Sequence, residues 1–229
     1  MMQLAILAGG LGTRLSGAIP AGLPKPLAPV AGRPFLDHLL DWAIERGADD
    51  IVLLSGHGSQ AIRDQVGRDH RGVPVRHSVE AVPLGTGGAL VNARSLLAEE
   101  FVLVNGDTFV DADLVALREG LHSSSVVMGL VEVPDTGRFG RVEVMDGVVT
   151  GFLEKGAGGP GLINAGVYAL RRSVVDSLPP GASSFERDFL EPRLAEVSPG
   201  YLRCGPTFFD IGVPADYRAA DRHFTEDRA

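Results

Sequence analysis

The chain has 229 residues, 45% of them hydrophobic, which suits one large α/β domain or a domain with a modest lobe. Its formal net charge of −8 disfavours a nucleic-acid partner, because such a partner calls for a basic surface. The single cysteine, Cys204, excludes an internal disulfide. No apolar run approaches the roughly 18 residues of a membrane helix, and no basic segment precedes the first apolar run, so we expect a cytoplasmic protein without a membrane partner.

The chain opens with a strand and a glycine-rich loop. Met2–Leu7 is a short apolar run that predicts a buried parallel strand. The loop after it holds three glycines, a threonine and an arginine: Gly9, Gly10, Gly12, Thr13 and Arg14. Glycine lets backbone N–H groups turn towards an anion and lets a large ligand approach the main chain. With Lys25 close behind, this stretch predicts a nucleotide phosphate site.

Helices and strands alternate over the next segments. A turn is expected at residues 28–32. A helix is expected over 36–44 with Gly47 as its stop, and a short helix with Ser59 as its cap through Val66. Buried strands are expected at 51–54 and 73–79. This βαβαβ order is typical of a doubly wound parallel sheet.

A second glycine cluster, residues 85–88, predicts the start of a helix, and an apolar strand follows at 101–104. That strand ends in Asn105-Gly106-Asp107, which places a carboxylate where α/β sheets bind ligands. Asp111 is expected to cap the next helix.

The second half is expected to consist mostly of strands, unlike the alternating strands and helices of the first half. Strands are expected at 126–133, 141–144, 148–155, 162–170 and 207–211, with a final helix from Pro214 to near Phe224. Asp146-Gly147 predicts a hairpin turn, and Ser183-x-x-Glu186 matches a capping box opening a helix through Leu190. We expect an α/β fold with a smaller α+β lobe, and one domain over 1–229 divided into halves 1–122 and 123–229.

Lysine is scarce: 19 arginines accompany only Lys25 and Lys155. The compact ammonium group of lysine suits contact with a phosphate oxygen, so Lys25 and Lys155 are candidate phosphate-binding residues. The dinucleotide pattern GxGxxG fails because Leu15 replaces its third glycine, and no Walker pattern follows the first strand. The six histidines have no zinc-ligand spacing.

Several motifs together resemble the sugar-phosphate nucleotidyltransferases. LAGGLGTRL from Leu7 and PKPLAPVAG from Pro24 resemble the family's triphosphate signature. EAVPLGTGGAL from Glu80 resembles its base-reading segment, and VNGDTFVD from Val104 its metal-binding strand end. FLEK, INAGVY and FFDIGVPADY resemble the sugar-phosphate wall and a second metal ligand.

The resemblance implies a Rossmann-like nucleotide-diphospho-sugar transferase fold and a set of site residues. It implies catalytic roles for Arg14, Lys25, Asp107 and Asp210, with Mg²⁺ held by the two aspartates. Nucleotide contacts would come from Leu7, Ala8, Gly9, Gly10, Gly12, Thr13, Arg14, Lys25, Glu80, Gly85, Asn105 and Asp107. Contacts to the sugar phosphate would come from Gly140, Glu154, Lys155 and Asn164.

Within the family, NGDTF, SFERDFLE and FFDIGVPADY are most similar to D-glycero-α-D-manno-heptose 1-phosphate guanylyltransferases. The partners implied are an NTP, with GTP favoured, and a sugar 1-phosphate, with the heptose favoured; a homo-oligomer is possible. Uridylyl-, cytidylyl- or guanylyltransferases for N-acetylmuramate, mannose or glucose 1-phosphate remain alternatives. A glycosyltransferase of similar fold and a non-catalytic nucleotide-sugar sensor remain open as different classes.

Overall fold

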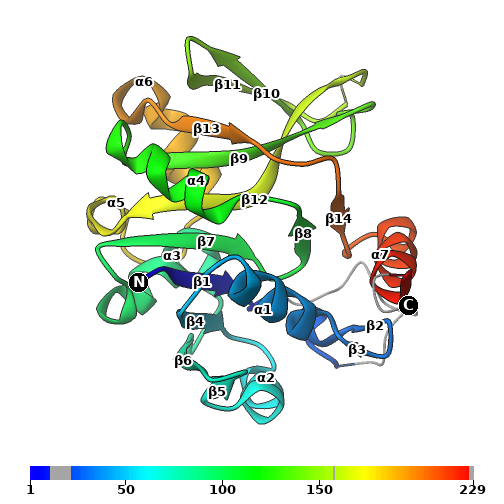
Figure 1. The fold of residues 1–229 in the computed structure, drawn as a ribbon. Coiled ribbons are helices and arrows are strands. Elements are labelled where there is room, and N and C mark those ends of the chain that lie inside the picture. Colours follow the sequence, from blue (N-terminus) through cyan, green and yellow to red (C-terminus); the bar gives the residue numbers. More distant parts are fainter. Residues whose placement is uncertain (11–21, 157, 227–229) are drawn as a thin grey trace.

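A ten-stranded sheet forms the centre of the molecule (Figure 1). The computed structural model describes residues 1–10, 22–156 and 158–226. The strand order in the sheet is β10-β11-β13-β9-β12-β7-β1-β4-β6-β5. The predicted Arg14, Gly12 and Thr13 lie outside the described residues.

The elements have the following bounds. The strands are β1 (Gln3–Leu7), β2 (Pro29–Val30), β3 (Arg33–Pro34), β4 (Asp50–Ser55), β5 (Asp69–His70), β6 (Val73–Val79), β7 (Glu100–Asn105), β8 (Thr108–Val110), β9 (Val126–Val133), β10 (Arg141–Met145), β11 (Val148–Leu153), β12 (Gly161–Arg171), β13 (Gly200–Arg203) and β14 (Phe208–Asp210). The α-helices are α1 (Phe35–Glu45), α2 (Ser59–Val66), α3 (Gly85–Ala93), α4 (Leu114–Glu119), α5 (Arg172–Asp176), α6 (Leu194–Val197) and α7 (Pro214–Glu226). Short turns of helix include η2 (Lys25–Leu27), of 3₁₀ type, and η5 (Phe185–Leu190), of π type.

The first half winds in both directions from β1. β1 pairs in parallel with β4 on one side and with β7 on the other, so that Leu7 lies level with Leu54 and Asn105. β6 continues the parallel run beyond β4. The strand order therefore reverses between β1 and β7, and ligands of α/β sheets bind at the carboxyl ends of strands at such a point.

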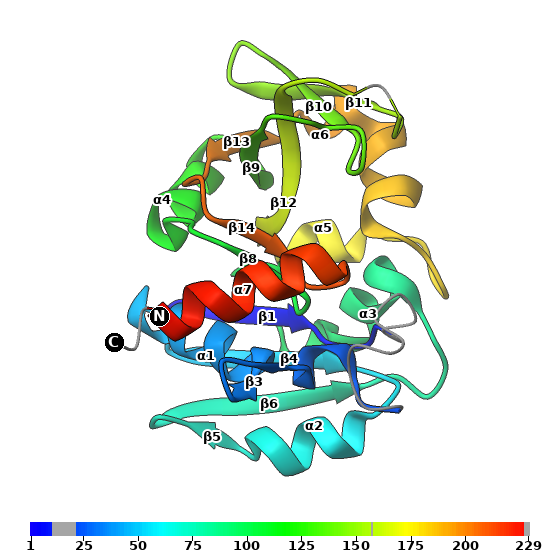
Figure 2. The ribbon, with the colours of Figure 1, turned by 90° about the vertical axis from the view of Figure 1, so that its right-hand side faces the viewer.

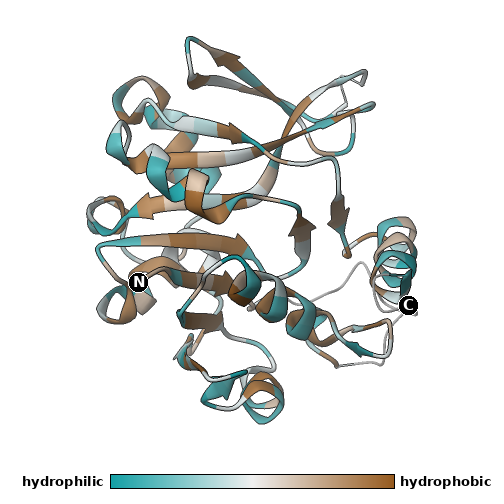
Figure 3. Cartoon of the chain, in the orientation of Figure 1, coloured by the Kyte–Doolittle hydropathy of each residue, from teal (hydrophilic) through white to brown (hydrophobic). Residues whose placement is uncertain are grey.

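Helices cover both faces of the sheet, and the central strands are coloured mostly hydrophobic in Figure 3. One buried cluster joins α1, α4 and α7 to one face, and a second joins α3, α5 and η5 to the other. β1 and β4 are buried almost throughout because they have neighbours in the sheet and helices above and below. The fold is the predicted doubly wound α/β fold.

The strands of the second half extend the same sheet. β12 lies antiparallel between β7 and β9, and the β10–β11 hairpin forms the far edge. Asp146 and Gly147 both have positive φ, 50° and 84°, as a type I′ turn requires, so the predicted hairpin turn is confirmed.

The C-terminal segment returns to the first half, where α7 lies beside β2 and β14 and its Phe224 ring packs against Phe35 of α1 (Figure 2). β14 pairs antiparallel with β8, which brings Asp210 level with Thr108. The Tyr217 hydroxyl donates to the Pro29 carbonyl, and the Ala31 N–H donates to Asp221 at 2.7 Å. The C-terminal segment thereby meets both the β2–β3 turn and the residues that follow β7.

Three expected helix caps are wrong. Gly58, with φ 69°, is the N-cap of α2, and Ser59 is its first residue. Asp113, and not Asp111, caps α4 by accepting from the N–H groups of Val115 and Ala116. At η5 the cap is Ser184, which accepts from the Arg187 N–H, so the proposed capping box at Ser183 does not form.

No helix in the described part of the chain is long and apolar enough to cross a membrane.

Replacing Asp113 by Ala should lower the free energy of unfolding by about 1 kcal/mol, because two N–H groups at the start of α4 lose their acceptor. Urea denaturation followed by circular dichroism measures this loss. Asp111→Ala is the matched variant: it removes only a partly exposed pair with Arg46 and should cost less. A larger loss for Asp111→Ala would contradict the assignment of the cap.

Candidate functional site

A cleft of about 620 Å³ lies at the carboxyl ends of β1, β4 and β7. Eight of the predicted nucleotide residues line it: Leu7, Gly9, Gly10, Lys25, Glu80, Gly85, Asn105 and Asp107. Ala8 does not, because it is fully buried and its N–H donates to the Leu54 carbonyl at 2.7 Å. Sequence reasoning did not single out Gly56, His57 or Thr86, which also line the cleft. All three lie in or beside glycine-rich turns, and only the tertiary structure shows which residues of such turns line the cleft.

Glu80 is held at the wall next to the glycine loop. Its Oε2 accepts from the Leu84 N–H at 2.9 Å, and Oε2 would lie 3.4 Å from a Cβ built on Gly56. Burial raises the pKa of this carboxyl, and the Leu84 hydrogen bond offsets part of that rise. Oε1 has no hydrogen-bond partner among the described residues. A fixed carboxylate with one free oxygen can accept from the N–H groups of a base.

The glycines at the start of α3 allow another chain segment to dock. Gly85 has φ 71°, and a Cβ on it would lie 2.5 Å from the Ser183 carbonyl oxygen. That oxygen accepts from the N–H groups of Gly87 and Gly88 at 2.8 and 3.4 Å. A side chain at Gly85 would therefore push away the loop that precedes η5.

Lys25 and Asp107 line the floor of the cleft, and Lys25 also pairs with Asp210. The Lys25 side chain is 6% exposed, and its Nζ lies 2.5 Å from Asp107 Oδ2 and 3.4 Å from Asp210 Oδ1. Gly212 makes room for this arrangement, since a Cβ on it would lie 2.1 Å from Nζ. The Gly212 N–H also donates to Asp210 Oδ1 at 2.8 Å. The structure thus brings together three predicted residues that are 82 and 185 positions apart.

The two aspartates fit a magnesium ion. A buried cation, the Lys25 ammonium, already lies between carboxylate oxygens that converge from two strands. In the described ranges no three His, Cys, Asp or Glu residues gather as a metal cage. Mg²⁺ typically takes one or two carboxylates and completes its shell with phosphate oxygens and water. Asp107 and Asp210 provide such a donor set.

The residues predicted for the sugar phosphate lie apart from this floor. Gly140 has φ 85°, and a Cβ on it would lie 2.8 Å from the Leu153 carbonyl oxygen, which brings it beside the end of β11. Glu154 and Lys155 follow β11 directly and are exposed. Neither forms an ion pair with another described residue.

Asn164 occupies an irregular part of β12. Its register with β9 shifts between Asn164 and Tyr168, where four steps along β12 oppose two along β9. Gly166, inside the bulge, has φ 70°, and a Cβ on it would lie 2.6 Å from the Asn105 Nδ2. Bulges re-aim side chains next to functional sites. This bulge brings the backbone beside Asn164 against Asn105 in the cleft.

Comparison with known proteins agrees with this geometry. A family model described as "Nucleotidyl transferase" matches residues 4–227. The chain is 35% identical to a D-glycero-alpha-D-manno-heptose 1-phosphate guanylyltransferase of Aneurinibacillus thermoaerophilus, over 96% of this chain and 97% of that protein. It is 33% identical to the enzyme of the same name from Campylobacter jejuni, over 94% and 97%. The chain belongs to the nucleotidyl transferase family.

A solved structure is similar along the whole chain. The crystal structure of HddC from Yersinia pseudotuberculosis complexed with GMP-PN superposes on this nucleotidyl transferase with a TM-score of 0.86 and 35% identity. The match covers 98% of this chain and 100% of that one. The predicted family and fold are confirmed.

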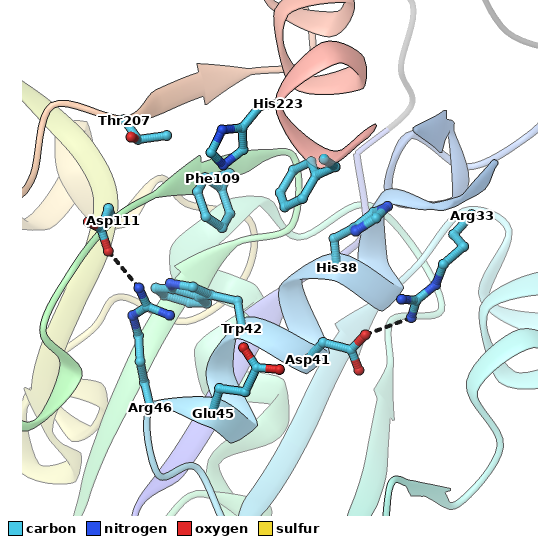
Figure 4. A pocket seen from close by; sticks show the side chains of 11 residues that line it. Arg33, His38, Asp41, Trp42, Glu45, Arg46, Phe109, Asp111, Thr207 and His223 are labelled. Atoms are coloured by element: carbon cyan, nitrogen blue, oxygen red, sulfur yellow. Dashed lines mark hydrogen bonds and ion pairs between the residues drawn. The ribbon is translucent and has the colours of Figure 1, made fainter. Parts of the chain in front are cut away.

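A second hollow of this nucleotidyl transferase, of about 380 Å³, lies between α1, β8 and α7 (Figure 4). Asp111 lies on its wall and pairs with Arg46 at 2.6 Å, whereas Asp113, directly before α4, is the cap. Arg33, on the opposite wall, pairs with Asp41 at 2.7 Å. Both arginines that line the hollow are therefore already neutralised by carboxylates.

Replacing Glu80 by Gln should raise the free energy of unfolding slightly at pH 8 and leave it unchanged near pH 4. A carboxyl with a raised folded-state pKa destabilises the fold only where it is ionised, above the ordinary value of 4.5. Below that value both states are protonated and the cost vanishes. Urea unfolding of both proteins at the two pH values measures this. An equal difference at both values would contradict the role of burial.

Proposed function

We propose that this nucleotidyl transferase joins an NTP, most favourably GTP, to a sugar 1-phosphate, most favourably D-glycero-α-D-manno-heptose 1-phosphate, with release of pyrophosphate. The observation that carries the proposal is the match over 97% of the length of two heptose 1-phosphate guanylyltransferases. The position of Glu80 supports a purine with donor groups, because guanine has N–H groups that can donate hydrogen bonds to a free carboxylate oxygen.

The reaction needs no general base. The second pKa of a sugar phosphate lies near 6, so its oxygens are already anionic at neutral pH. One of them would attack the α-phosphorus, forming the new P–O bond as the bond to pyrophosphate breaks on the far side. The protein then has to align two anions that repel each other and to balance the developing charge.

In this proposal the chain's own residues divide that work. Lys25 neutralises charge at the α-phosphate, while the loop at Gly9 and Gly10, continuing through Gly12, Thr13 and Arg14, holds the β- and γ-phosphates. Glu80 and the backbone at Gly85 contact the base, and Leu7 and Asn105 line the cleft around the nucleotide, with Ala8 buried behind them. Lys155 binds the sugar phosphate, while Gly140, Glu154 and Asn164 contact the sugar.

Asp107 and Asp210 would hold Mg²⁺, which supplies Lewis-acid activation of the bound phosphate. We also infer that residues 1–229 act as one domain, with 1–122 as its nucleotide half and 123–229 as its sugar half. A cytoplasmic enzyme would suit these substrates, and the proposal is compatible with a homo-oligomer.

The proposal is tested by mixing the protein and Mg²⁺ with each of four NTPs and a panel of sugar 1-phosphates. The panel includes heptose, mannose, glucose and N-acetylmuramate 1-phosphates, and pyrophosphate release is followed. GTP with the heptose phosphate should give the highest kcat/KM. A better pair would reassign the substrates, and release with no pair would favour a glycosyltransferase or a sensor.

Asp107→Asn should reduce pyrophosphate release at least about a hundredfold, since one carboxylate for the metal and the closest partner of Lys25 are both lost. Steady-state kinetics over a range of Mg²⁺ concentrations measure the change. Asp111→Asn, an aspartate four residues along, is the control and should leave the rate within about twofold. Near-normal turnover of Asp107→Asn would remove Asp107 from the site.

A further inference from the structure

One carboxylate that this mechanism does not use lies between the two halves of the molecule. Glu186, in η5, accepts from the Tyr168 hydroxyl at 2.7 Å through Oε1. Its Oε2 accepts from the hydroxyls of Thr86 at 3.1 Å and Ser184 at 3.3 Å. Thr86 belongs to the cleft wall, whereas Tyr168 belongs to β12. Glu186 therefore joins the nucleotide side of the cleft to the strand that carries Asn164.

The direction of each hydrogen bond follows from the chemistry of the groups. An ionised carboxylate only accepts, so all three hydroxyls must donate to it. Thr86 is consistent with this, because its oxygen accepts from the Phe185 N–H at 2.8 Å and its own proton is left for Glu186.

The Tyr168 hydroxyl in turn determines the direction of its hydrogen bond with Asn164. It is fully buried, and its ring packs edge-on against Phe185 with centroids 5.5 Å apart. Burial, together with the charge of Glu186, raises the pKa of the Tyr168 phenol well above its ordinary value. The phenol thus stays protonated and donates its only O–H hydrogen bond to Glu186, so its oxygen can only accept from Asn164.

Asn164 is fixed by these constraints. Its Nδ2 donates to the Tyr168 oxygen at 2.5 Å, and its Oδ1 accepts from the Gly166 N–H at 3.0 Å. The amide cannot turn over, because the reversed amide would set a donor against the Gly166 N–H. The second N–H of Nδ2 has no partner in the described part of the chain, and the residue is partly exposed.

We propose that Glu186 is a positioning residue for the sugar 1-phosphate: it acts through Tyr168 to hold the Asn164 amide with one N–H offered to an oxygen of a sugar hydroxyl. The inference rests on the proposed function. It assigns Glu186 no contact with the nucleotide or with the reacting phosphates. Its loss therefore changes recognition of one substrate and not of the other.

Glu186→Gln tests the direction of the hydrogen bonds that link Glu186, Tyr168 and Asn164, with little change in the shape of the side chain. Two hydroxyls donate to Oε2 and one to Oε1, so the oxygen of the introduced amide takes the Oε2 position and its NH₂ faces Tyr168. The phenol must then accept from that NH₂ and turn its proton towards Asn164, which disrupts the Asn164 amide. Tyr168→Phe interrupts the same series of hydrogen bonds by removing the hydroxyl. Glu191→Gln, an exposed carboxylate beside η5, is the control.

We expect Glu186→Gln and Tyr168→Phe each to raise the KM for the sugar 1-phosphate about five- to tenfold, the size of one lost hydrogen bond. The KM for the NTP should stay within about twofold. In an Asn164→Ala background, Glu186→Gln should produce no further rise, because its effect passes through that amide. Glu191→Gln should match the wild type.

An equal rise of both KM values, or a full additional rise in the Asn164→Ala background, would overturn the inference in favour of a structural role. So would unchanged kinetics of Glu186→Gln. Thermal unfolding of each variant shows whether it remains folded. If Glu186→Gln does not, the kinetics of Tyr168→Phe decide between the outcomes. Failure of the proposed function is seen separately, as a wild-type protein that releases no pyrophosphate with any sugar 1-phosphate of the panel.

Discussion

The buried ammonium of Lys25, held between Asp107 and Asp210, is the contact on which the arrangement of the site depends. A buried cation is costly unless carboxylates pair with it, and each carboxylate here lies at the end of a different strand. The pairing therefore requires η2, β7 and β14 to converge. It also explains why β14 and α7 return to the first half, and why Gly212 has no room for a side chain.

A second constraint joins the halves on the opposite side of the cleft. The loop at Ser183 docks on the first turn of α3, and the glycines there leave no side chain in its way. Docking places the following residues, Phe185 and Glu186, against Tyr168 in β12. The same glycine cluster that resembles a base-reading segment thus also positions a segment about 100 residues later. A substitution at Gly85 would disturb both sides of the cleft.

The fold was largely predictable from the sequence because apolar periodicity and strand-end glycines are local signals. The meeting of Asp107 with Asp210 was accessible only through the resemblance, since no local pattern relates residues so far apart. Two of the cap errors involve tertiary contacts that local patterns cannot show: the Asp111 carboxylate pairs with Arg46, and the Ser183 backbone bonds to Leu84, Gly87 and Gly88. Glu186 was overlooked because a capping box already explained it. The available signal was Tyr168, a hydroxyl in an apolar strand that needed an acceptor.

The charges in the cleft lead to a final point about the metal. Within the described ranges, Lys25 faces Asp107 and Asp210, and Glu80 adds a third carboxylate on the wall of the same cleft. One cation against three anions repels a triphosphate, in a chain whose overall charge is also negative. Arg14 lies outside the described residues, and Lys155 lies on the exposed end of β11. A divalent cation on the two aspartates would neutralise this local excess of negative charge, so binding of the nucleotide and of Mg²⁺ should strengthen each other.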